Sequence, residues 1–502
     1  MFWQLLVIAA VFWAVYFRWQ RRRIRKVYDE ISSGALQELP VIGHAHLLGG
    51  NHEDVMQLFQ KAGRIATAQG GLSTFWLVHK LYLVVTDPVS AEVIMKSCVE
   101  KDNFTMKFIR TVIGNGSIFA PVKIWRPRRK ILAPTFSMKN LNQFVEVFDK
   151  QSHIMGKQLQ ETVYENVSVW KYITTYTFDS ICETVMGVQL GSQFNTDQPF
   201  LKSFEKIADM VSQRIATPWL HPDFIYKSIP SYKEFVKHRK VLYGFINDLI
   251  QKKRNEMALH GVDENAPRSF LQMLIMESGG EKGYTDLELC EETMVLIMAG
   301  TDTSAVGTAF TTVLLSRFPE IQAKVYQELQ DVFGNSDRPL TVQDLPNLKY
   351  LEAVIKESLR MYPPVPVIVR EVNHDVVLPN GTTLVEGVSV FLNIWGIHRN
   401  NHFWGEDVDV FRPERFLEGP LKHPVQFTPF SHAPRNCLGY NYAMMSMKTA
   451  LANLLRKYKI LPYKGLAESE YDKSLRVKFD IMMKPVEDYV VRLEPRECSL
   501  YK

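Results

Sequence analysis

The sequence predicts a mainly α protein, with a large helical part and small β-sheets in one body, behind an N-terminal membrane anchor. Apolar residues recur at helical spacing through most of residues 89 to 375, as in "FLKSFEKIADMVSQRI" and "PEIQAKVYQELQDVF". Short runs rich in β-branched and aromatic residues come before and after that region. The chain begins "MFWQLLVIAAVFWAVYF", which is apolar apart from Gln4. Together these features favour a helical body attached to a membrane.

The N-terminal segment has the length and the flanking charges of a signal-anchor. A helix of about 17 residues is roughly 25 Å long, which just suffices to cross the apolar core of a bilayer. The basic run "RWQRRRIRK" follows it, and an excess of basic residues keeps that side in the cytosol. A cleaved signal peptide would carry its basic residues before the apolar region instead. We expect a transmembrane anchor over residues 1–17, a basic hinge stiffened by "ELPVIGH" over residues 18–45, and the body over residues 46–502.

Composition excludes several classes of protein. No Gly/Ser-rich linker divides the 502 residues, and 46% of them are hydrophobic, which is ample for one large packed body. The net charge of +5 is mild and no nucleic-acid-binding motif is present, so no nucleic acid is expected as a partner. The cysteines are scattered, which suggests neither a disulfide framework nor a CxxC metal site and fits a reducing compartment: Cys98, Cys182, Cys290, Cys437 and Cys498.

Strand signals lie in a few short segments. Residues 72 to 86, "LSTFWLVHKLYLVVT", alternate and are rich in β-branched and aromatic side chains, which predicts a hairpin. Further strand-like pieces occur in "VIVREV", "DVVLP", "GVSVFLN" and "LRVKFDIMMKP". These pieces are too few and too short for a large sheet.

The stretch 294 to 315, "MVLIMAGTDTSAVGTAFTTVLL", predicts a buried central helix. A second membrane span is less favourable, because Asp302 in hydrocarbon costs on the order of 3 kcal/mol. Gly300 weakens the helix and the Thr303 hydroxyl can bond back to a carbonyl one turn earlier, so we expect the helix to open here. Asp302 and Thr303 allow two interpretations: a hydrogen-bonded pair on a helix face, or a proton relay.

Three later motifs add charged residues and a cysteine. In "KESLR", Glu357 and Arg360 stand at i and i+3 on one helix face, and "FRPERF" supplies Arg415, so one carboxylate can be held between two guanidiniums. That role is structural. In "PFSHAPRNCLGY", Cys437 precedes a helix-like stretch, where free N–H groups and the helix dipole favour a thiolate. A lone cysteine, however, is more often buried and inert.

The motifs in their order carry a family resemblance. "AGTDTS", E-x-x-R, the "PERF" loop and F-x-x-x-x-R-x-C-x-G, preceded by "WRPRR" as W-x-x-x-R, resemble the cytochrome P450 family over essentially the whole chain. "TFDSICETVMG" and "PRNCLG" are similar to the family 4 clan, and the run as a whole is similar to an insect microsomal member. The resemblance implies the cytochrome P450 fold with haem b as its cofactor.

The resemblance also implies a role for each motif residue. Cys437 is expected to be the axial thiolate ligand of the iron, which favours O–O cleavage. Four residues suited to carboxylates are expected at the haem propionates: Trp125, Arg129, Arg370 and Arg435. The catalytic pair expected to deliver protons is Asp302 and Thr303. The structural group remains Glu357, Arg360 and Arg415.

A haem-thiolate monooxygenase of the endoplasmic reticulum, facing the cytosol, is therefore expected. It would insert one oxygen atom of O₂ into a lipophilic substrate, such as a fatty acid or derivative, a hydrocarbon, a hormone or a foreign compound, by hydroxylation or epoxidation. Two alternatives remain: a haem-thiolate isomerase or dehydratase acting on peroxides, and a non-catalytic haem-binding sensor or carrier. The apolar and aromatic patch "TPWLHPDFIY" suits either the membrane interface or the core.

Electrons have to come from another protein, because no G-x-G-x-x-G motif follows a strand. The resemblance implies NADPH–cytochrome P450 reductase as the donor, and allows cytochrome b5 as a further one. The basic run "KIWRPRRK", with Lys422, could steer an acidic flavoprotein, or could be a solvated helix face with one or two arginines turned inward.

Two positions depart from the family pattern. The cysteine loop normally has glycine where this chain has Ala433, which would cost about 1 kcal/mol if that position needs a positive φ. Many family 4 members carry a glutamate that can be esterified to haem where this chain has Ala299. We therefore expect haem to be held without that covalent bond.

Overall fold

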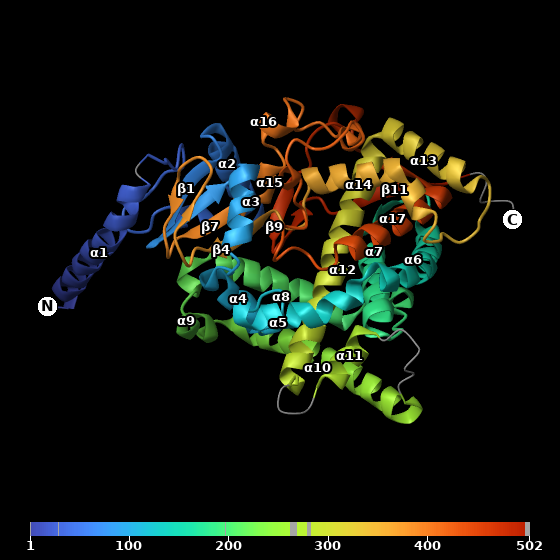
Figure 1. Ribbon diagram of the computed structural model, residues 1–502, viewed down its shortest axis with the longest axis horizontal. Coiled ribbons are helices and arrows are strands. Elements are labelled where there is room, and N and C mark those ends of the chain that lie inside the picture. Colours follow the sequence, from blue (N-terminus) through green and yellow to red (C-terminus); the bar gives the residue numbers. More distant parts are fainter. Residues whose placement is uncertain (1, 29, 196, 262–268, 279–282, 497–502) are drawn as a thin grey trace.

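The computed structural model describes residues 2–28, 30–195, 197–261, 269–278 and 283–496. Helices make up most of the body, and helix α12 (Asp286–Arg317) runs through its middle (Figure 1). The sheets are small, and the largest of them lies at one end, near helices α2 and α3. The predicted mainly α class with small sheets is thereby confirmed.

The remaining α-helices surround α12 or cover the sheets. Their bounds are α1 (Phe2–Val27), α2 (His52–Ala68), α3 (Pro88–Ser97), α4 (Asn103–Ile113), α5 (Val122–Leu132), α6 (Met138–Leu159), α7 (Trp170–Ile181), α8 (Pro199–Ala216), α9 (Asp223–Ser228), α10 (Pro230–His260), α11 (Phe270–Met276), α13 (Pro319–Phe333), α14 (Lys349–Met361), α15 (Ile394–Ile397), α16 (Asn401–Trp404) and α17 (Tyr440–Lys457).

The largest sheet has the strand order β1-β2-β7-β4. Its strands β1 (Leu72–Leu77) and β2 (Lys80–Val85) pair antiparallel and form the predicted hairpin. Strand β2 pairs parallel with β7 (Ser389–Asn393), which pairs antiparallel with β4 (Val367–Glu371). The smaller sheets are β3-β11-β8, β10-β9 and β5-β6, with bounds β3 (Asn166–Ser168), β5 (Val376–Val377), β6 (Thr383–Leu384), β8 (Tyr458–Pro462), β9 (Val477–Asp480), β10 (Met482–Pro485) and β11 (Val490–Pro495).

Helix α12 is the predicted central helix, but it does not open at Gly300. It begins with a capping box in which the Thr285 side chain accepts from the Glu288 N–H, and it continues without a break to Arg317. Gly300 serves packing instead, because a Cβ there would lie 2.6 Å from Cδ1 of Ile181 on α7. The expected opening is therefore wrong, and the glycine lets α7 approach α12 closely.

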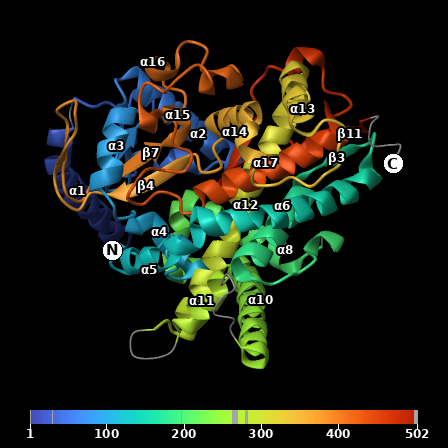
Figure 2. The same ribbon diagram turned by 45° about the vertical axis from the view of Figure 1, so that its right-hand side comes forward.

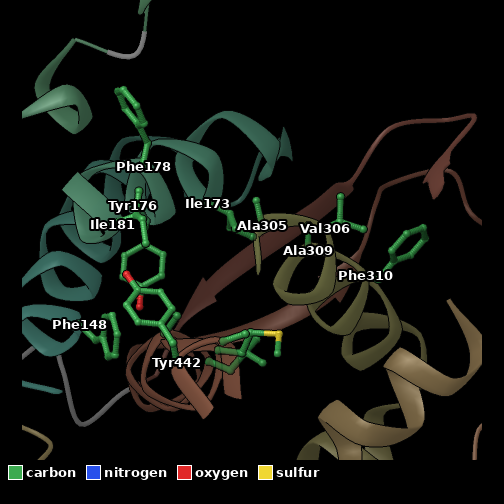
Figure 3. Packing of buried hydrophobic residues seen from close by; sticks show 14 of the residues in the cluster. Phe148, Ile173, Tyr176, Phe178, Ile181, Ala305, Val306, Ala309, Phe310 and Tyr442 are labelled. Carbon is green, nitrogen blue, oxygen red and sulfur yellow. The ribbon is translucent and has the colours of Figure 1, made fainter. Parts of the chain in front are cut away.

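Helices α7 and α17 pack on α12 in the main core, and α6 packs on both of them; Figure 2 shows α6 beside α17. Figure 3 shows Tyr176 of α7 next to Tyr442 of α17, with Phe148 of α6 beside Tyr442. The rings of Phe148 and Tyr442 lie 5.0 Å apart, and the buried Tyr176 hydroxyl donates to the carbonyl of Ser446. Helix α17, which begins just after Cys437, is thus fixed to the same core as α12.

Helix α1 contains the apolar N-terminal segment and continues into the basic run, and it projects from the body (Figure 1). Within the described ranges, no helix combines the length and the apolar character needed to cross a membrane. The "ELPVIGH" segment is attached to the sheet, since the His44 N–H donates to the Trp76 carbonyl at 2.7 Å and Gly43 pairs with Leu77. The anchor, hinge and body boundaries stay predictions.

Candidate active site

Cys437 lies in a loop that leads into α17. Its backbone N–H donates to the Phe430 carbonyl at 2.8 Å. Arg129 on α5 reaches across and donates to the carbonyl and to the side-chain oxygen of Asn436, both at 2.8 Å. Arg129 was expected among the cations that receive carboxylates; the structure places its guanidinium on the cysteine loop, which it holds to α5.

The protein around the Cys437 thiol opposes its ionisation, which a bound cation would reverse. Burial raises its pKa, whereas the Gly439 N–H and Arg129 lower it less. The loop by itself therefore does not favour the thiolate, contrary to the helix-terminus argument, because the cost of desolvation is larger. A metal cation at Sγ would deprotonate the thiol outright. The side chain also keeps accessible surface and lines a hollow of about 570 Å³, unlike buried Cys98, Cys182 and Cys290.

Ala433 does not carry the strain expected of it. Among the described residues, the non-glycine positions with positive φ include Ser431, at 59°, and not Ala433. The left-handed conformation, which costs roughly 1–2 kcal/mol for a residue with a Cβ, thus falls two residues earlier in the loop. The expected cost at Ala433 is wrong.

Three cations, Lys101, Arg370 and Arg435, lie close enough to repel one another, and within the described ranges none of them forms an ion pair with a carboxylate. The Arg435 guanidinium stacks over the Trp125 ring at 5.0 Å, and the Nε atoms of Arg370 and Arg435 are buried and make no hydrogen bond in the described part of the chain. Lys101, which no motif indicated, is enclosed with them. Burial, followed by repulsion from Arg370 and Arg435, lowers the Lys101 pKa well below its ordinary range. Such a group is costly unless an anion pairs with it.

Asp302 and Thr303 lie on different sides of the same turn of α12. Met298, Ala299, Gly300 and Thr303 keep some accessible surface, while the residues on either side of them along the helix are buried. The Thr303 hydroxyl donates to the Ala299 carbonyl at 2.8 Å. Asp302 lies about 100° further round the helix and is buried. Burial raises the pKa of its carboxyl, and Lys484 lowers it less.

Glu357 lies between two guanidiniums in the interior. Arg360 donates to both of its carboxylate oxygens at 2.7 and 2.8 Å, and Arg415 donates to Oε1 at 3.0 Å. Arg360 also donates to the carbonyls of His398 and Val408. The short helix that carries Arg415 and the segment that leads to the cysteine loop are thus held on α14.

Comparison with known proteins gives matches over most of the chain. A family model described as Cytochrome P450 matches residues 34–491. The chain belongs to the cytochrome P450 family. Similar curated proteins include Cytochrome P450 4V2 of Homo sapiens, 31% identical over 92% of this chain and 89% of the relative, and Cytochrome P450 4d2 of Drosophila melanogaster, 32% identical over 84% and 87%. Cytochrome P450 4c21 of Blattella germanica is 31% identical over 98% of this chain and 99% of the relative.

The resemblance to the family and to its family 4 members is thereby confirmed, and this cytochrome P450 is a haem-thiolate monooxygenase. The residues present fit haem. Cys437 is a cysteine with accessible surface within the fold, and the cations Lys101, Arg370 and Arg435, which form no ion pair in the described part of the chain, suit the two propionate carboxylates. The donor set therefore suits both the iron and the propionates of the cofactor.

Removing one of these cations should have opposite effects on the apoprotein and on haem binding. In Arg370→Met we expect haem to dissociate about tenfold faster, because a charge-assisted hydrogen bond contributes about 1.5–3 kcal/mol. The apoprotein should unfold at an equal or higher temperature, because a buried cation without a partner is gone. Haem transfer to apomyoglobin and thermal unfolding measure the two effects. Unchanged haem loss in Arg370→Met would remove Arg370 from the propionate site.

His398 connects the Arg360 helix to the cysteine loop segment of the cytochrome P450. Its Nδ1 lies 3.1 Å from the Arg360 carbonyl, and its Nε2 accepts from the Thr428 N–H at 2.9 Å. The ring is therefore neutral, with its proton on Nδ1. Burial, followed by repulsion from Arg360, lowers its pKa from 6.5 to about 3.

This lowered pKa makes the fold sensitive to acid. A histidine that resists protonation when folded binds a proton on unfolding, so its contribution is complete above pH 6.5 and is lost as the pH falls toward about 3. In His398→Gln we expect a weaker decline of the urea midpoint across that window. His374→Gln, at an exposed position, is the control. Equal declines in all three proteins would contradict the assignment.

Sequence reasoning missed four titratable residues around the site: Lys101, Arg128, His398 and Lys484. Arg128 binds Glu288 and Glu292 of α12, each at 2.7 Å, and so holds α5 on the central helix. The sequence allowed one or two arginines of this run to turn inward, but it did not single out Arg128. The other three stand in no motif, and their partners are far away in the sequence.

Proposed function

We propose that this cytochrome P450 inserts one oxygen atom of O₂ into a lipophilic substrate, a fatty acid or derivative, a hydrocarbon, a hormone or a foreign compound, by hydroxylation or epoxidation. The accessible, mostly apolar turn Met298–Gly300 in the middle of α12 is the observation that supports it, because apolar linings suit lipophilic ligands. Half-buried Val367–Val369 on β4 add to this character. Haem, when bound through Cys437, supplies the iron at which O₂ is activated.

Thr303 and Asp302 are proposed to transfer protons during the reaction. The Thr303 hydroxyl directs its own proton to Ala299, which leaves its oxygen lone pairs to accept a proton from a neighbouring group. The Asp302 carboxyl, with its raised pKa, can hold a proton near neutral pH and release it. A water molecule between the two side chains would pass that proton to the turn of α12 that keeps accessible surface.

Electrons are proposed to come from NADPH through NADPH–cytochrome P450 reductase, with cytochrome b5 as a further donor. Three basic side chains are exposed on α5: Lys123, Arg126 and Lys130. Arg129 of the same helix holds the cysteine loop, and Lys422, which comes shortly before that loop in the sequence, is also exposed. A group of like charges attracts an acidic partner. These side chains support docking of an acidic protein on the Cys437 side.

The protein is proposed to be anchored by residues 1–17 in the endoplasmic reticulum membrane, with residues 18–45 as hinge and residues 46–502 in the cytosol. Helix α1 exposes Phe12 and Trp13, and the "TPWLHPDFIY" patch exposes Trp219 and Phe224. Exposed aromatic residues favour the membrane interface, and the basic run after residue 17 favours the cytosolic orientation.

A lipid screen tests this function. The full chain, reconstituted with reductase and NADPH, is incubated with fatty acids, their derivatives, hydrocarbons and hormones, and products are detected by mass spectrometry. We expect a product heavier by one oxygen atom, with ¹⁸O supplied by ¹⁸O₂. Conversion of a lipid hydroperoxide without NADPH would favour the isomerase or dehydratase, and no NADPH consumption would favour a sensor or carrier.

Thr303→Ala should uncouple NADPH use from product. We expect NADPH consumption to continue while the product per NADPH falls at least about tenfold and hydrogen peroxide rises, since proton transfer by a positioned group contributes about 10²–10⁴-fold. Thr308→Ala is the matched control, because its buried hydroxyl makes the same bond to the carbonyl four residues earlier, at 2.8 Å. Equal coupling in both variants would contradict the role of Thr303.

A further inference from the structure

A series of charged side chains leads from Asp302 to the surface. The Lys484 ammonium on β10 lies 4.0 Å from Asp302 Oδ1 and 3.9 Å from Asp480 Oδ2 on β9. Beyond Asp480, the His52 ring nitrogen on α2 lies 3.5 Å from Asp209 Oδ1 on α8. The ligand atoms of His52, Asp209 and Asp480 all lie within 4.8 Å of one another. Of the proposed catalytic pair, Asp302 belongs to this series and Thr303 does not.

Exposure rises steadily along the series. The exposed fraction of the side chain is 6% for Asp302, 11% for Lys484 and 14% for Asp480. It reaches 23% for His52 and 53% for Asp209. Helices α2 and α8 pack against β9, and α12 packs against β10, so the hairpin β9-β10 connects the central helix to the surface. The series therefore has one buried end and one end in solvent.

Lys484 is poised between two carboxyl groups. Both of its distances are longer than a hydrogen bond, and Asp480 Oδ1 is buried without a hydrogen-bond partner in the described part of the chain. Its ammonium lies 4.9 Å from the Trp170 ring and is carried on a flexible four-carbon stem. Closer pairing with one carboxylate requires it to leave the other.

We propose that Lys484 is a movable positioning residue that pairs alternately with Asp302 and Asp480, and so lets protons that enter at His52 and Asp209 reach Asp302. The inference rests on the proposed role of Asp302 in the reaction, and not on the identity of the substrate.

The exchange conserves charge and protons. In the first arrangement the ammonium pairs with the Asp302 carboxylate, and Asp480 carries a proton. In the second the ammonium pairs with the Asp480 carboxylate, and Asp302 carries that proton. One proton moves inward as one ammonium moves outward, so the three side chains stay neutral in sum and no isolated charge is buried. When Asp302 has released its proton and the ammonium returns, Asp480 takes a new one from solvent through His52 and Asp209.

The pKa directions agree with this exchange. Burial raises the pKa of both carboxyls, and Lys484 lowers both. Other titratable or charged groups that face the three side chains are Glu205 and Asp209 on α8, His52 on α2, Lys478 on β9, and Asp488 and Tyr489 before β11. These groups are unchanged in the variants below, so differences between variants report Lys484 and Asp480.

An infrared titration of the Asp302 carboxyl tests the proposal on the purified holoenzyme. The band is assigned by its loss in Asp302→Asn. In Lys484→Met we expect the midpoint of Asp302 to rise by at least about one pH unit, because an opposite charge at this distance shifts a pKa by about 1–3 units. In Asp480→Asn we expect it to fall, because Lys484 then pairs with Asp302 alone. Lys473→Met removes a surface lysine that pairs with Glu470 and should change nothing.

Equal Asp302 midpoints in wild type and Lys484→Met, or shifts of the same sign in Lys484→Met and Asp480→Asn, would overturn the proposal. Lys484→Gln makes the same comparison if the methionine variant does not bind haem. The pH profile of product per NADPH, with the lipid found by screening, should shift in the same two directions. If the lipid screen finds no product, the proposed function is contradicted and the infrared result still stands. If Thr303→Ala uncouples NADPH use as expected while the Asp302 midpoint is the same in all variants, this inference alone is overturned.

Discussion

Cys437→Ala is expected to abolish monooxygenase activity and the red-shifted absorption that a thiolate ligand gives to reduced haem with carbon monoxide. The sulfur is the thiolate donor of the cysteine loop, and alanine leaves no thiolate at that position. The fold should survive, because the loop contact made by residue 437 is its backbone N–H bond to Phe430, which alanine keeps. Difference spectra of the reduced, carbon monoxide-bound protein measure the effect.

Cys182→Ala is the control for this prediction. Cys182 is fully buried at the end of α7, so its replacement creates a small cavity and costs stability but no iron ligand. The red-shifted band should keep its position in that variant. A thiolate spectrum that persisted in Cys437→Ala would show that another residue binds the iron.

The parts of the fold that could be predicted from the sequence are those with a local pattern. The hairpin at 72 to 86 follows from alternation, and α12 follows from its length and from the cost of placing Asp302 in lipid. Glu357 and Arg360 are three residues apart on one helix, so their contact needs no knowledge of the tertiary fold. Arg415 is different, because it lies 58 residues after Glu357 and no local spacing fixes their contact.

The rest depends on burial and on contacts between distant residues. The thiolate was expected at Cys437 from the helix terminus, but desolvation outweighs that effect and is invisible in a sequence. Lys484 is 182 positions after Asp302 in the numbering and stands in a run without a motif. Gly300 reads as a weak point of a helix, yet its function is set by Ile181 on another helix. Each error comes from a partner that local spacing does not specify.

Glu357→Gln is expected to prevent the accumulation of folded, haem-loaded protein. Glutamine keeps the shape of the side chain and removes its charge, which leaves the fully buried Arg360 without its carboxylate and Arg415 with Asp407 as its remaining carboxylate partner. Breaking a buried pair in this way costs about 3–5 kcal/mol, and the total stability of a typical domain is about 5–15 kcal/mol. The loss also loosens the segment that leads to the cysteine loop, because Glu357 accepts the Arg412 N–H at 2.9 Å. Haem content of the soluble fraction and urea unfolding measure the two effects.

Glu352→Gln on the same helix separates this effect from a general intolerance of α14 to lost charge. Glu352 pairs with Lys356 and Lys448, but its side chain is 36% exposed, so water replaces much of what the mutation removes. We expect a loss of about 1 kcal/mol or less there and normal haem content. If Glu357→Gln were equally mild, Arg360 would have to be held by its carbonyl contacts, and Arg415 by Asp407 and its own carbonyl contacts. The attachment of the cysteine loop to α14 would then not depend on the carboxylate at its centre.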